Sequence, residues 1–216
     1  MTAVEMPKRT GDGTDGAGPP PGRRTAVLAV AGVLVAILLI GAAALLLVTG
    51  HSRDGGAVGG PFALVDGNGK TVTDADFRGR YLLVYFGYTF CPDVCPTTLT
   101  AVADAVDRLG SDAAHVQPVF ITIDPARDTP AVVKQYVASF GPEFIGLTGS
   151  ADQIATVARE YRVYYAEHRT GPGPNDYTMD HSSILYLMGP DGKFVAPLRA
   201  DATGSDLASA IRKAMS

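Results

Sequence analysis

The two cysteines of this chain, Cys91 and Cys95, are separated by three residues in the segment YTFCPDVCP, residues 88–96. Two thiols at this spacing can form a disulfide bond, bind a metal ion, or do both. We expect Cys91 at the end of a buried strand, and Cys95 followed by Pro96 at the start of a helix. A helix N-terminus has free N–H groups and partial positive charge, which stabilise the thiolate, the form that attacks disulfides and binds metals.

A metal site needs a third ligand, and His181 in the segment MDHSS, residues 179–183, is the candidate. It stands just before an expected strand, at the mouth of the sheet. A lone histidine there is more often structural, but opposite a thiol pair ligation is the stronger interpretation. Two thiolates and one imidazole form a soft donor set suited to Cu(I), whereas structural zinc usually takes four ligands. Cys91, Cys95 and His181 are therefore the predicted metal ligands.

Acidic residues accompany these ligands. Asp180 is predicted to orient His181, or to give a weak oxygen ligand to Cu(II). Asp93, between the thiols, is predicted either to act in a similar way or to be a solvated turn residue. The remaining histidines are interpreted as solvated surface residues; they are His51, His115 and His168.

A redox reaction is the alternative use of the cysteine pair. Oxidoreductases of the thioredoxin type carry a Cys-X-X-Cys motif, and the spacing here is one residue longer. No basic residue lies between the cysteines to lower their pKa, and Asp93 is expected to raise it. Both features favour metal binding over fast disulfide exchange without excluding exchange. A peroxidase would need an arginine beside Cys91, and the sequence supplies no evident candidate.

Residues 25–48 contain no charged residue and are long enough to cross a membrane as a helix. The basic residues before them favour a cytoplasmic N-terminus; they are Lys8, Arg9, Arg23 and Arg24. A cleaved signal peptide has a shorter apolar region and a small-residue cleavage site, whereas this run is longer and ends at a poor site. We therefore predict an uncleaved transmembrane anchor, with a cleaved signal or a buried core helix as alternatives. An anchor or a signal would export the rest of the chain.

The other parts of the chain differ in composition. Residues 1–24 are rich in Gly, Pro, Asp and Thr and are predicted to be a disordered cytoplasmic N-terminus. Residues 49–60 are predicted to be a flexible linker, and residues 61–216 a single domain large enough for one well-buried core. The formal net charge of −4 argues against a nucleic acid partner, because phosphate binding needs a basic surface.

Residues 61–216 show the pattern of an α/β domain with a mixed sheet. Apolar runs at 81–88 and 116–123 predict central strands buried on both faces. The first of these strands is followed by the cysteines and then by a helix, an order that suggests a thioredoxin-like fold. The other expected elements are a hairpin at 62–73, helices at 96–109, 130–140, 151–161 and 203–215, a strand beginning within 162–165, a Gly/Pro loop at 169–177, and short strands at 144–147, 183–188 and 193–196.

Asp124, Arg127 and Asp128 follow the second long strand, in the segment ITIDPARDTP. Functional sites of α/β proteins gather at this edge of the sheet, so these residues are predicted to shape a partner surface. A salt-bridged turn with a helix cap is an equally good interpretation.

Three segments resemble the Sco/SenC family of membrane-anchored copper proteins. Residues 87–96 (GYTFCPDVCP) are similar to its cysteine signature, and residues 121–130 (ITIDPARDTP) to its Asp-Pro-X-Arg-Asp-Thr-Pro stretch. Residues 161–192 resemble its segment with Tyr-Arg-Val-Tyr-Tyr, Asp-His-Ser and Gly-Pro-Asp-Gly. The resemblance covers residues 61–216, and the expected anchor agrees with it.

The resemblance implies a thioredoxin-like fold that binds Cu(I) and Cu(II). It assigns the copper ligands to Cys91, Cys95 and His181, with Asp180 as an acidic neighbour. It implies a copper metallochaperone that helps to mature the binuclear copper centre of cytochrome c oxidase. The alternative function is a thiol–disulfide oxidoreductase that reduces the cysteines of the same target.

The partners implied in this way are the copper-bearing subunit of cytochrome c oxidase and other copper chaperones. The expected location is the bacterial inner membrane, crossed once, with the C-terminal domain in the periplasm. Glu5, Asp12 and Asp15 favour this over a mitochondrial intermembrane space, because transit peptides contain few acidic residues.

Overall fold

The computed structural model describes Leu34 and residues 58–216. Within the compact unit Gly55–Ser216, seven strands form one mixed sheet. Their order across the sheet is β2 (Thr71–Thr73), β1 (Ala63–Asp66), β5 (Ile145–Thr148), β4 (Val116–Thr122), β3 (Tyr81–Gly87), β8 (Ile184–Met188) and β9 (Phe194–Arg199).

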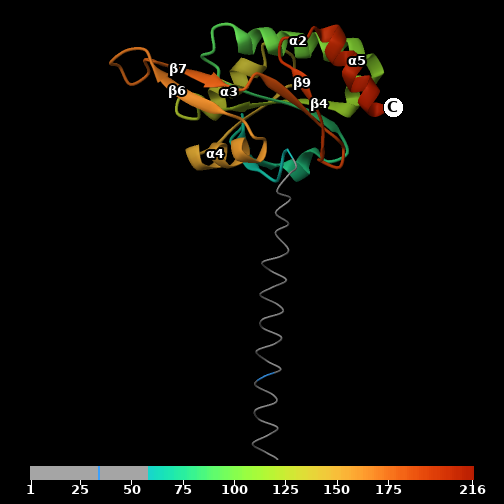
Figure 1. Ribbon diagram of the computed structural model, residues 1–216, viewed down its shortest axis with the longest axis horizontal. Helices are drawn as coiled ribbons and strands as arrows, with labels where there is room; N and C mark the ends of the chain where they lie inside the picture. Colours follow the sequence, from blue (N-terminus) through green and yellow to red (C-terminus); the bar gives the residue numbers. More distant parts are fainter. Residues whose placement is uncertain (1–33, 35–57) are drawn as a thin grey trace, which may run out of the picture. The chain divides into compact units, whose positions relative to one another are not determined.

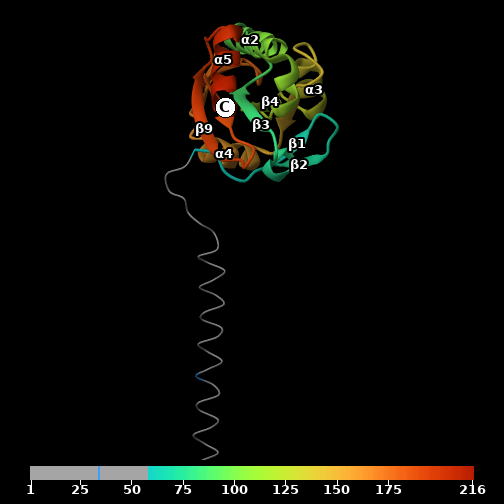
Figure 2. The same cartoon turned by 90° about the vertical axis from the view of Figure 1, so that its right-hand side faces the viewer.

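Helices cover both faces of this sheet, as Figure 2 shows. One face carries α2 (Val94–Leu109), α3 (Pro130–Val137) and α5 (Gly204–Met215), and the other carries α4 (Ala151–Glu160). Short 3₁₀ helices, η1 (Asp74–Phe77) and η2 (Gly110–His115), complete the connections. The predicted α/β layers and mixed sheet are confirmed.

The central strands bring two loops to the same edge of the sheet. Strands β3 and β4 are parallel, paired from Tyr81 with Val116 to Gly87 with Thr122. Every residue of β4 and all but the first of β3 are buried, as their apolar runs predict. Because parallel strands end at one edge, the cysteine loop (residues 88–93) lies beside the loop that follows β4.

Helix α2 begins at Val94, so Cys95 lies in its first turn. The sequence predicted a start at Pro96, two residues later. A glycine ends the preceding strand for a steric reason: a Cβ on Gly87 would lie 2.8 Å from Cys95 Sγ and 3.0 Å from the Phe120 ring. Gly87 thus lets the Cys95 sulfur approach the end of β3.

The region that carries His181 differs most from the sequence prediction. Strands β6 (Tyr165–Arg169) and β7 (Tyr177–His181) pair antiparallel and form a separate two-stranded sheet. The predicted loop at 169–177 is in fact the turn of this β6–β7 hairpin, and His181 is the last residue of a strand. The Gly and Pro residues at 171–174 signalled the turn correctly, but the strand after it was missed.

The predicted transmembrane segment, residues 25–48, lies outside the described residues except for Leu34. Residues 1–24 and the linker up to residue 57 lie outside them as well. Among the residues that the structure describes, no helix is long and apolar enough to cross a membrane.

Candidate metal centre

Three elements bring the predicted ligands together. Cys91 is in the cysteine loop, Cys95 in the first turn of α2, and His181 at the end of β7. Their ligand atoms all lie within 4.8 Å of one another. Cys95 Sγ and His181 Nε2 are 3.5 Å apart. Cys95 is buried and Cys91 half-buried, so one sulfur is shielded and the other is accessible from solvent.

The imidazole of His181 presents Nε2 to the sulfurs. Its Nδ1 lies 3.2 Å from the carbonyl oxygen of Ser182. A carbonyl oxygen can only accept, so in the neutral ring the hydrogen is assigned to Nδ1, and Nε2 keeps a lone pair. The rings of Tyr85 and Tyr88 meet the imidazole edge-on, with centroids at 5.9 and 6.2 Å. The tautomer and the ring orientation are therefore those that a metal ligand needs.

The two thiols differ in acidity. A hydrogen bond from the Cys95 thiol lowers the pKa of Cys91 to about 3, although burial opposes the shift. The backbone N–H of Cys95 also donates to Cys91 Sγ at 3.4 Å. The same sulfur–sulfur contact and burial raise the pKa of Cys95. When both cysteines are reduced, Cys91 is therefore the thiolate and Cys95 retains its proton.

The sequence predicts that Asp93 raises the pKa of both thiols, yet the pKa of Cys91 is lowered. The backbone of Asp93 forms a hydrogen bond that helps to lower the pKa of Cys91. Asp93 is the N-cap residue of α2, and its side-chain oxygen lies 3.5 Å from Thr97 Oγ1. It is exposed at the loop surface, in agreement with the turn interpretation.

Asp180 does not reach His181. Successive side chains of a strand point to opposite faces, and β7 places Asp180 on the outer face. Its carboxylate instead contacts His168 Nε2 at 2.7 Å, and both side chains are more than half exposed. The Ser182 carbonyl takes the orienting role that the sequence assigned to Asp180. His168 and His115 are exposed, as predicted, and His51 lies outside the described residues.

The acidic residues after β4 are too buried to form a partner surface, with Asp124 3% and Asp128 0% exposed. Asp128 accepts hydrogen bonds from the Thr89 backbone N–H (3.0 Å), Thr89 Oγ1 (2.5 Å) and Thr122 Oγ1 (2.5 Å). It fastens the cysteine loop to the end of β4. Of the two interpretations, the salt-bridged turn is the one found, with Thr129 as the cap of α3.

Similarity to known proteins agrees with this geometry. The family model described as SCO1/SenC matches residues 50–216.

This chain belongs to the SCO1/SenC family.

Among the relatives of this Sco-family chain is Protein sco1 of Schizosaccharomyces pombe, which is 43% identical over 156 residues, 71% of this chain and 59% of that protein. The chain spans about half the length of the first curated relatives that it matches, between 43% and 60%.

Two similar solved structures are copper-bound forms of ScoI. The Arabidopsis thaliana protein has 42% identity and a TM-score of 0.68, with 74% of this chain and 98% of that chain covered. The Bradyrhizobium japonicum protein has 45% identity and a TM-score of 0.67, with 73% and 99% covered. The thioredoxin-like Sco fold predicted from the sequence is thereby confirmed.

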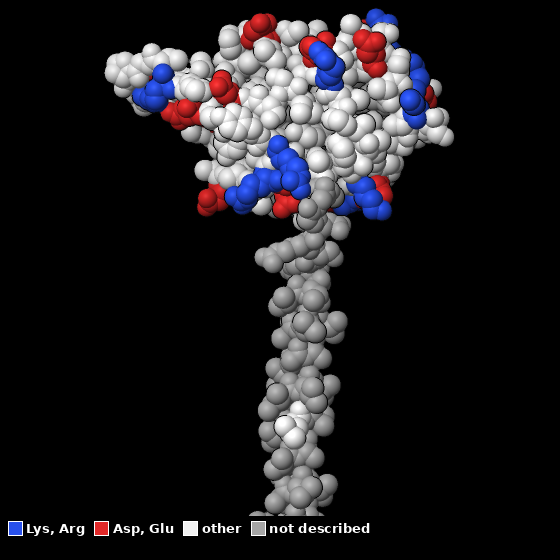
Figure 3. Space-filling view, in the orientation of Figure 1, with Lys and Arg blue, Asp and Glu red and all other residues white. Residues whose placement is uncertain are grey.

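Exposed apolar residues lie close to the ligands along the chain of this Sco-family domain. Phe90 and Val94 flank the cysteines and are 60% and 45% exposed. Tyr164, 64% exposed, precedes β6, and Ile184, 36% exposed, begins β8. All four lie within a few residues of a ligand or of its strand partner. The β6–β7 hairpin, at the left of Figure 3, carries charged residues of both signs.

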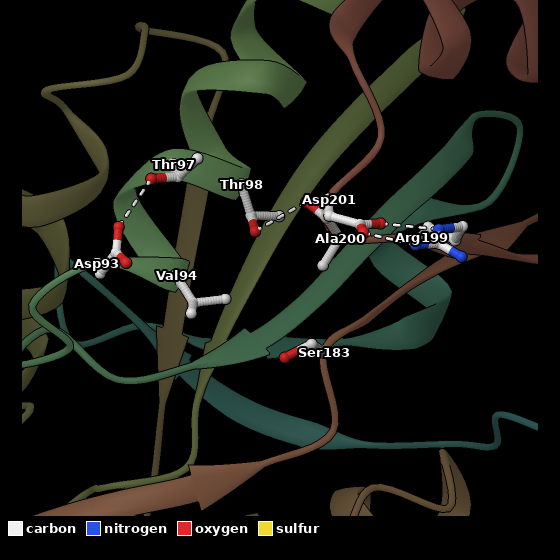
Figure 4. A pocket seen from close by; sticks show the side chains of 8 residues that line it. All are labelled: Asp93, Val94, Thr97, Thr98, Ser183, Arg199, Ala200 and Asp201. Carbon is white, nitrogen blue, oxygen red and sulfur yellow. Dashed lines mark hydrogen bonds and ion pairs between the residues drawn. The ribbon is translucent and has the colours of Figure 1, made fainter.

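A hollow of about 530 Å³ lies along the first turns of α2 (Figure 4). Val94 and Thr98 of the helix form one side, and Ser183, Ala200 and Arg199 form the other.

Proposed function

We propose that this chain is a copper metallochaperone that binds Cu(I) through Cys91, Cys95 and His181. The observation that carries the proposal is the convergence of the three ligand atoms within 4.8 Å, with the Nε2 lone pair of His181 directed at the sulfurs. Two sulfurs and one nitrogen make a soft set that suits Cu(I), with no fourth protein ligand required. The similar ScoI proteins with copper bound support this choice of metal.

The acidity of the thiols suggests an order for copper capture. The Cys91 thiolate, half-buried and ionised at neutral pH, meets the ion first. Cys95 then loses its proton, because a metal-bound thiol is deprotonated, and His181 Nε2 completes the set. Copper binding therefore releases one proton from the pair.

Release requires a ligand from the recipient to replace one of these three. A three-ligand site leaves room for an incoming donor, and Cys91 is the more accessible sulfur. The exposed apolar residues around the site, Phe90 and Val94 among them, suit transient contact with a second protein surface. The proposed recipient is the copper-bearing subunit of cytochrome c oxidase, whose binuclear copper centre would be filled, and other copper chaperones are proposed as donors.

The location follows from the sequence alone and is part of the proposal. Residues 25–48 would anchor the chain in the bacterial inner membrane, and residues 61–216 would lie in the periplasm. In that compartment the thiols must be kept reduced before copper can bind.

A thiol–disulfide reductase acting on the same target is the second candidate. The observation that favours it is the asymmetry of the pair, with an accessible low-pKa thiolate at Cys91 and a buried thiol at Cys95. The first could attack a target disulfide, and the second could then resolve the mixed disulfide. This reaction does not need His181.

An anaerobic Cu(I) titration of residues 50–216 tests the copper proposal. We expect one ion per chain, and we expect His181→Ala to weaken Cu(I) affinity by at least about 100-fold, more than the loss of a residue that only orients a ligand. His168→Ala is the matched control, because His168 lies on the same hairpin but on its outer face. A stoichiometry far from one, or a wild-type affinity in His181→Ala, would overturn the ligand assignment.

The same variant separates the two functions. If His181→Ala loses oxidase maturation in cells but still reduces a disulfide peptide at the wild-type rate, copper delivery is the main function. If oxidase maturation survives without His181, the reductase is the better assignment.

A further inference from the structure

We infer that Arg127 is a positioning residue of the copper site, which holds the β6–β7 hairpin, and with it His181, against the cysteine loop. This inference rests on the proposed function, since it takes Cys91, Cys95 and His181 as the copper ligands. Arg127 touches none of the three and acts through the elements that carry them.

The hairpin needs such a fastening because the main sheet does not hold it. β6 and β7 pair only with each other, from Tyr165 with His181 to Arg169 with Tyr177. Figure 1 shows the hairpin extending from the side of the domain. The backbone ladder that fixes β3 and the cysteine loop therefore does not fix the distance from His181 Nε2 to the sulfurs.

Arg127 bridges this gap with its guanidinium group. Nη1 donates to the carbonyl oxygens of Tyr177 (3.0 Å) and Asn175 (3.3 Å), at the start of β7. The guanidinium carbon lies 3.6 Å from the ring centroid of Tyr177, and 4.7 Å from that of Phe90 in the cysteine loop. One cation thus stacks against aromatic rings of both elements.

Asp124 holds the cation in place. Its Oδ2 accepts from Arg127 Nε at 2.5 Å, and its Oδ1 accepts from the Tyr177 hydroxyl at 2.8 Å. The Arg127 and Asp124 side chains are 7% and 3% exposed, so solvent screens this ion pair little. The Asp124 carboxylate therefore binds both Arg127 and Tyr177 of strand β7, which Arg127 also contacts.

Strand β7 connects the residues that Arg127 contacts to the metal ligand His181. Tyr177, Met179 and His181 alternate with the exposed Thr178 and Asp180, so they share the inner face of the strand. The face that packs on Arg127 at one end presents the imidazole to the sulfurs at the other. A shift of β7 relative to the cysteine loop would move Nε2 away from a ligand position that tolerates only a few tenths of an ångström.

Neutralising Asp124 does not by itself explain why this residue is an arginine. Its Nη2 is buried and has no hydrogen-bond partner among the described residues. An unsatisfied buried donor is unfavourable, and a lysine could neutralise Asp124 without it. The flat guanidinium is accounted for by its position between the rings of the hairpin and those of the cysteine loop.

A double-mutant cycle on the full chain tests the inference. Cu(I) affinity is measured by anaerobic competition with a chromophoric chelator for wild type, Arg127→Met, His181→Ala and the double variant. We expect Arg127→Met to weaken affinity by about tenfold when His181 is present, the scale of residues that orient metal ligands. In the His181→Ala background the same change should alter affinity by less than about twofold, because its effect runs through the imidazole.

Two controls accompany the cycle. Arg169→Met removes an arginine of the same hairpin whose hydrogen bonds go to carbonyl oxygens of Gly171, Gly173 and Pro174 in the hairpin's own turn, and it should keep wild-type affinity. Arg127→Lys keeps the charge beside Asp124 but loses the stacking, and it should give an intermediate loss. If Arg127→Met does not fold, the cycle is run with the lysine variant.

The imidazole provides a second readout. In ¹⁵N-labelled wild type, Cu(I) should shift the His181 Nε2 resonance, and in Arg127→Met that shift should shrink or split. An equal loss of affinity with and without His181 would overturn the inference, because Arg127 would then act through the cysteine loop. So would wild-type affinity in Arg127→Met. If His181→Ala itself has no effect, it is the ligand assignment that fails, which is a distinct result.

Discussion

The cysteine loop and the β6–β7 hairpin bring ligands to the same point but are held in different ways. The loop follows a central strand, and its Thr89 is tied to the buried Asp128 by backbone and hydroxyl hydrogen bonds. The hairpin belongs to no larger sheet and is held by side chains, among them Arg127 and Tyr177. The sulfurs are therefore preset by the fold, while the histidine depends on contacts that are easier to disturb.

This difference would suit the proposed chaperone, which must both hold and release an ion. In that proposal the rigid thiol pair captures copper, and the histidine on its separately fastened hairpin can leave without disturbing the core. The following predictions test this difference between the cysteine loop and the hairpin, from the largest expected effect to the smallest.

Cys95→Ser should have the largest effect. It removes the shielded sulfur from the rigid side of the site, and a serine hydroxyl is a poor ligand for Cu(I). Copper affinity should fall further than the loss of at least about 100-fold expected for His181→Ala. Competition with a Cu(I) chelator measures both losses. A smaller loss in Cys95→Ser than in His181→Ala would reverse the assigned roles of the two regions.

Gly87→Ala should disturb the rigid side through packing. The new Cβ would meet Cys95 Sγ at 2.8 Å and the Phe120 ring at 3.0 Å. We expect the free energy of unfolding to fall by about 1–3 kcal/mol, as for other overpacked cores. Urea denaturation of the apo domain measures this change. An unchanged stability would mean that the end of β3 adapts and that the thiol pair is less firmly held than we conclude.

Tyr177→Phe should loosen the hairpin with a smaller cost. It removes the hydroxyl that donates to Asp124 at 2.8 Å but keeps the ring against Arg127. Stability should fall by about 1 kcal/mol, the typical worth of a buried hydrogen bond. Tyr164→Phe, at a 64% exposed tyrosine just before β6, is the control and should change neither stability nor copper affinity. Equal losses in the two variants would show that the Asp124 bond does not fasten the hairpin.

The pH dependence of the loop attachment should be the smallest effect. Burial raises the pKa of Asp128 above its ordinary value of 3.8. The folded state therefore keeps this proton to higher pH than the unfolded chain does. The contribution of protonated Asp128 to the free energy of unfolding is therefore present at low pH. It is lost as the pH rises from about 3.8 through the pKa of Asp128 in the folded state.

Asp128→Asn removes this titration. Relative to the variant, the free energy of unfolding of the wild type should decline as the pH rises through that range. Denaturation at a series of pH values measures the difference. A difference that stays constant with pH would contradict the raised pKa.

The two regions also differed in how far the sequence could predict them. The apolar runs of β3 and β4 predicted buried strands, and the cysteine segment predicted a helix start close to where α2 begins. Local patterns suffice there, because burial on both faces leaves few alternatives. Strand β7 was missed, because five residues of mixed polarity that pair with only one other strand give a weak signal.

The side-chain contacts were harder still. Asp180 stands next to His181 in the sequence, yet strand alternation turns it to the opposite face, toward His168. Arg127 and Asp128 were seen as a motif, but their partners Tyr177 and Thr89 are about 50 and 40 residues away along the chain. Adjacency in sequence gave the wrong partner for Asp180, and for Arg127 it gave Asp124 but not Tyr177.

The sequence by itself determined which residues could form the site. Cys91, Cys95 and His181 were recognisable by residue type, spacing and position relative to the expected strands. Soft metal ligands, helix starts and buried strands can all be predicted from local sequence patterns.

Only the tertiary structure decided how these ligands are presented. The approach of His181 Nε2 to Cys95 Sγ and the fastening of the hairpin by Arg127 depend on distances between segments that are far apart in the chain. Such distances are set by packing of the whole domain, which no local pattern encodes.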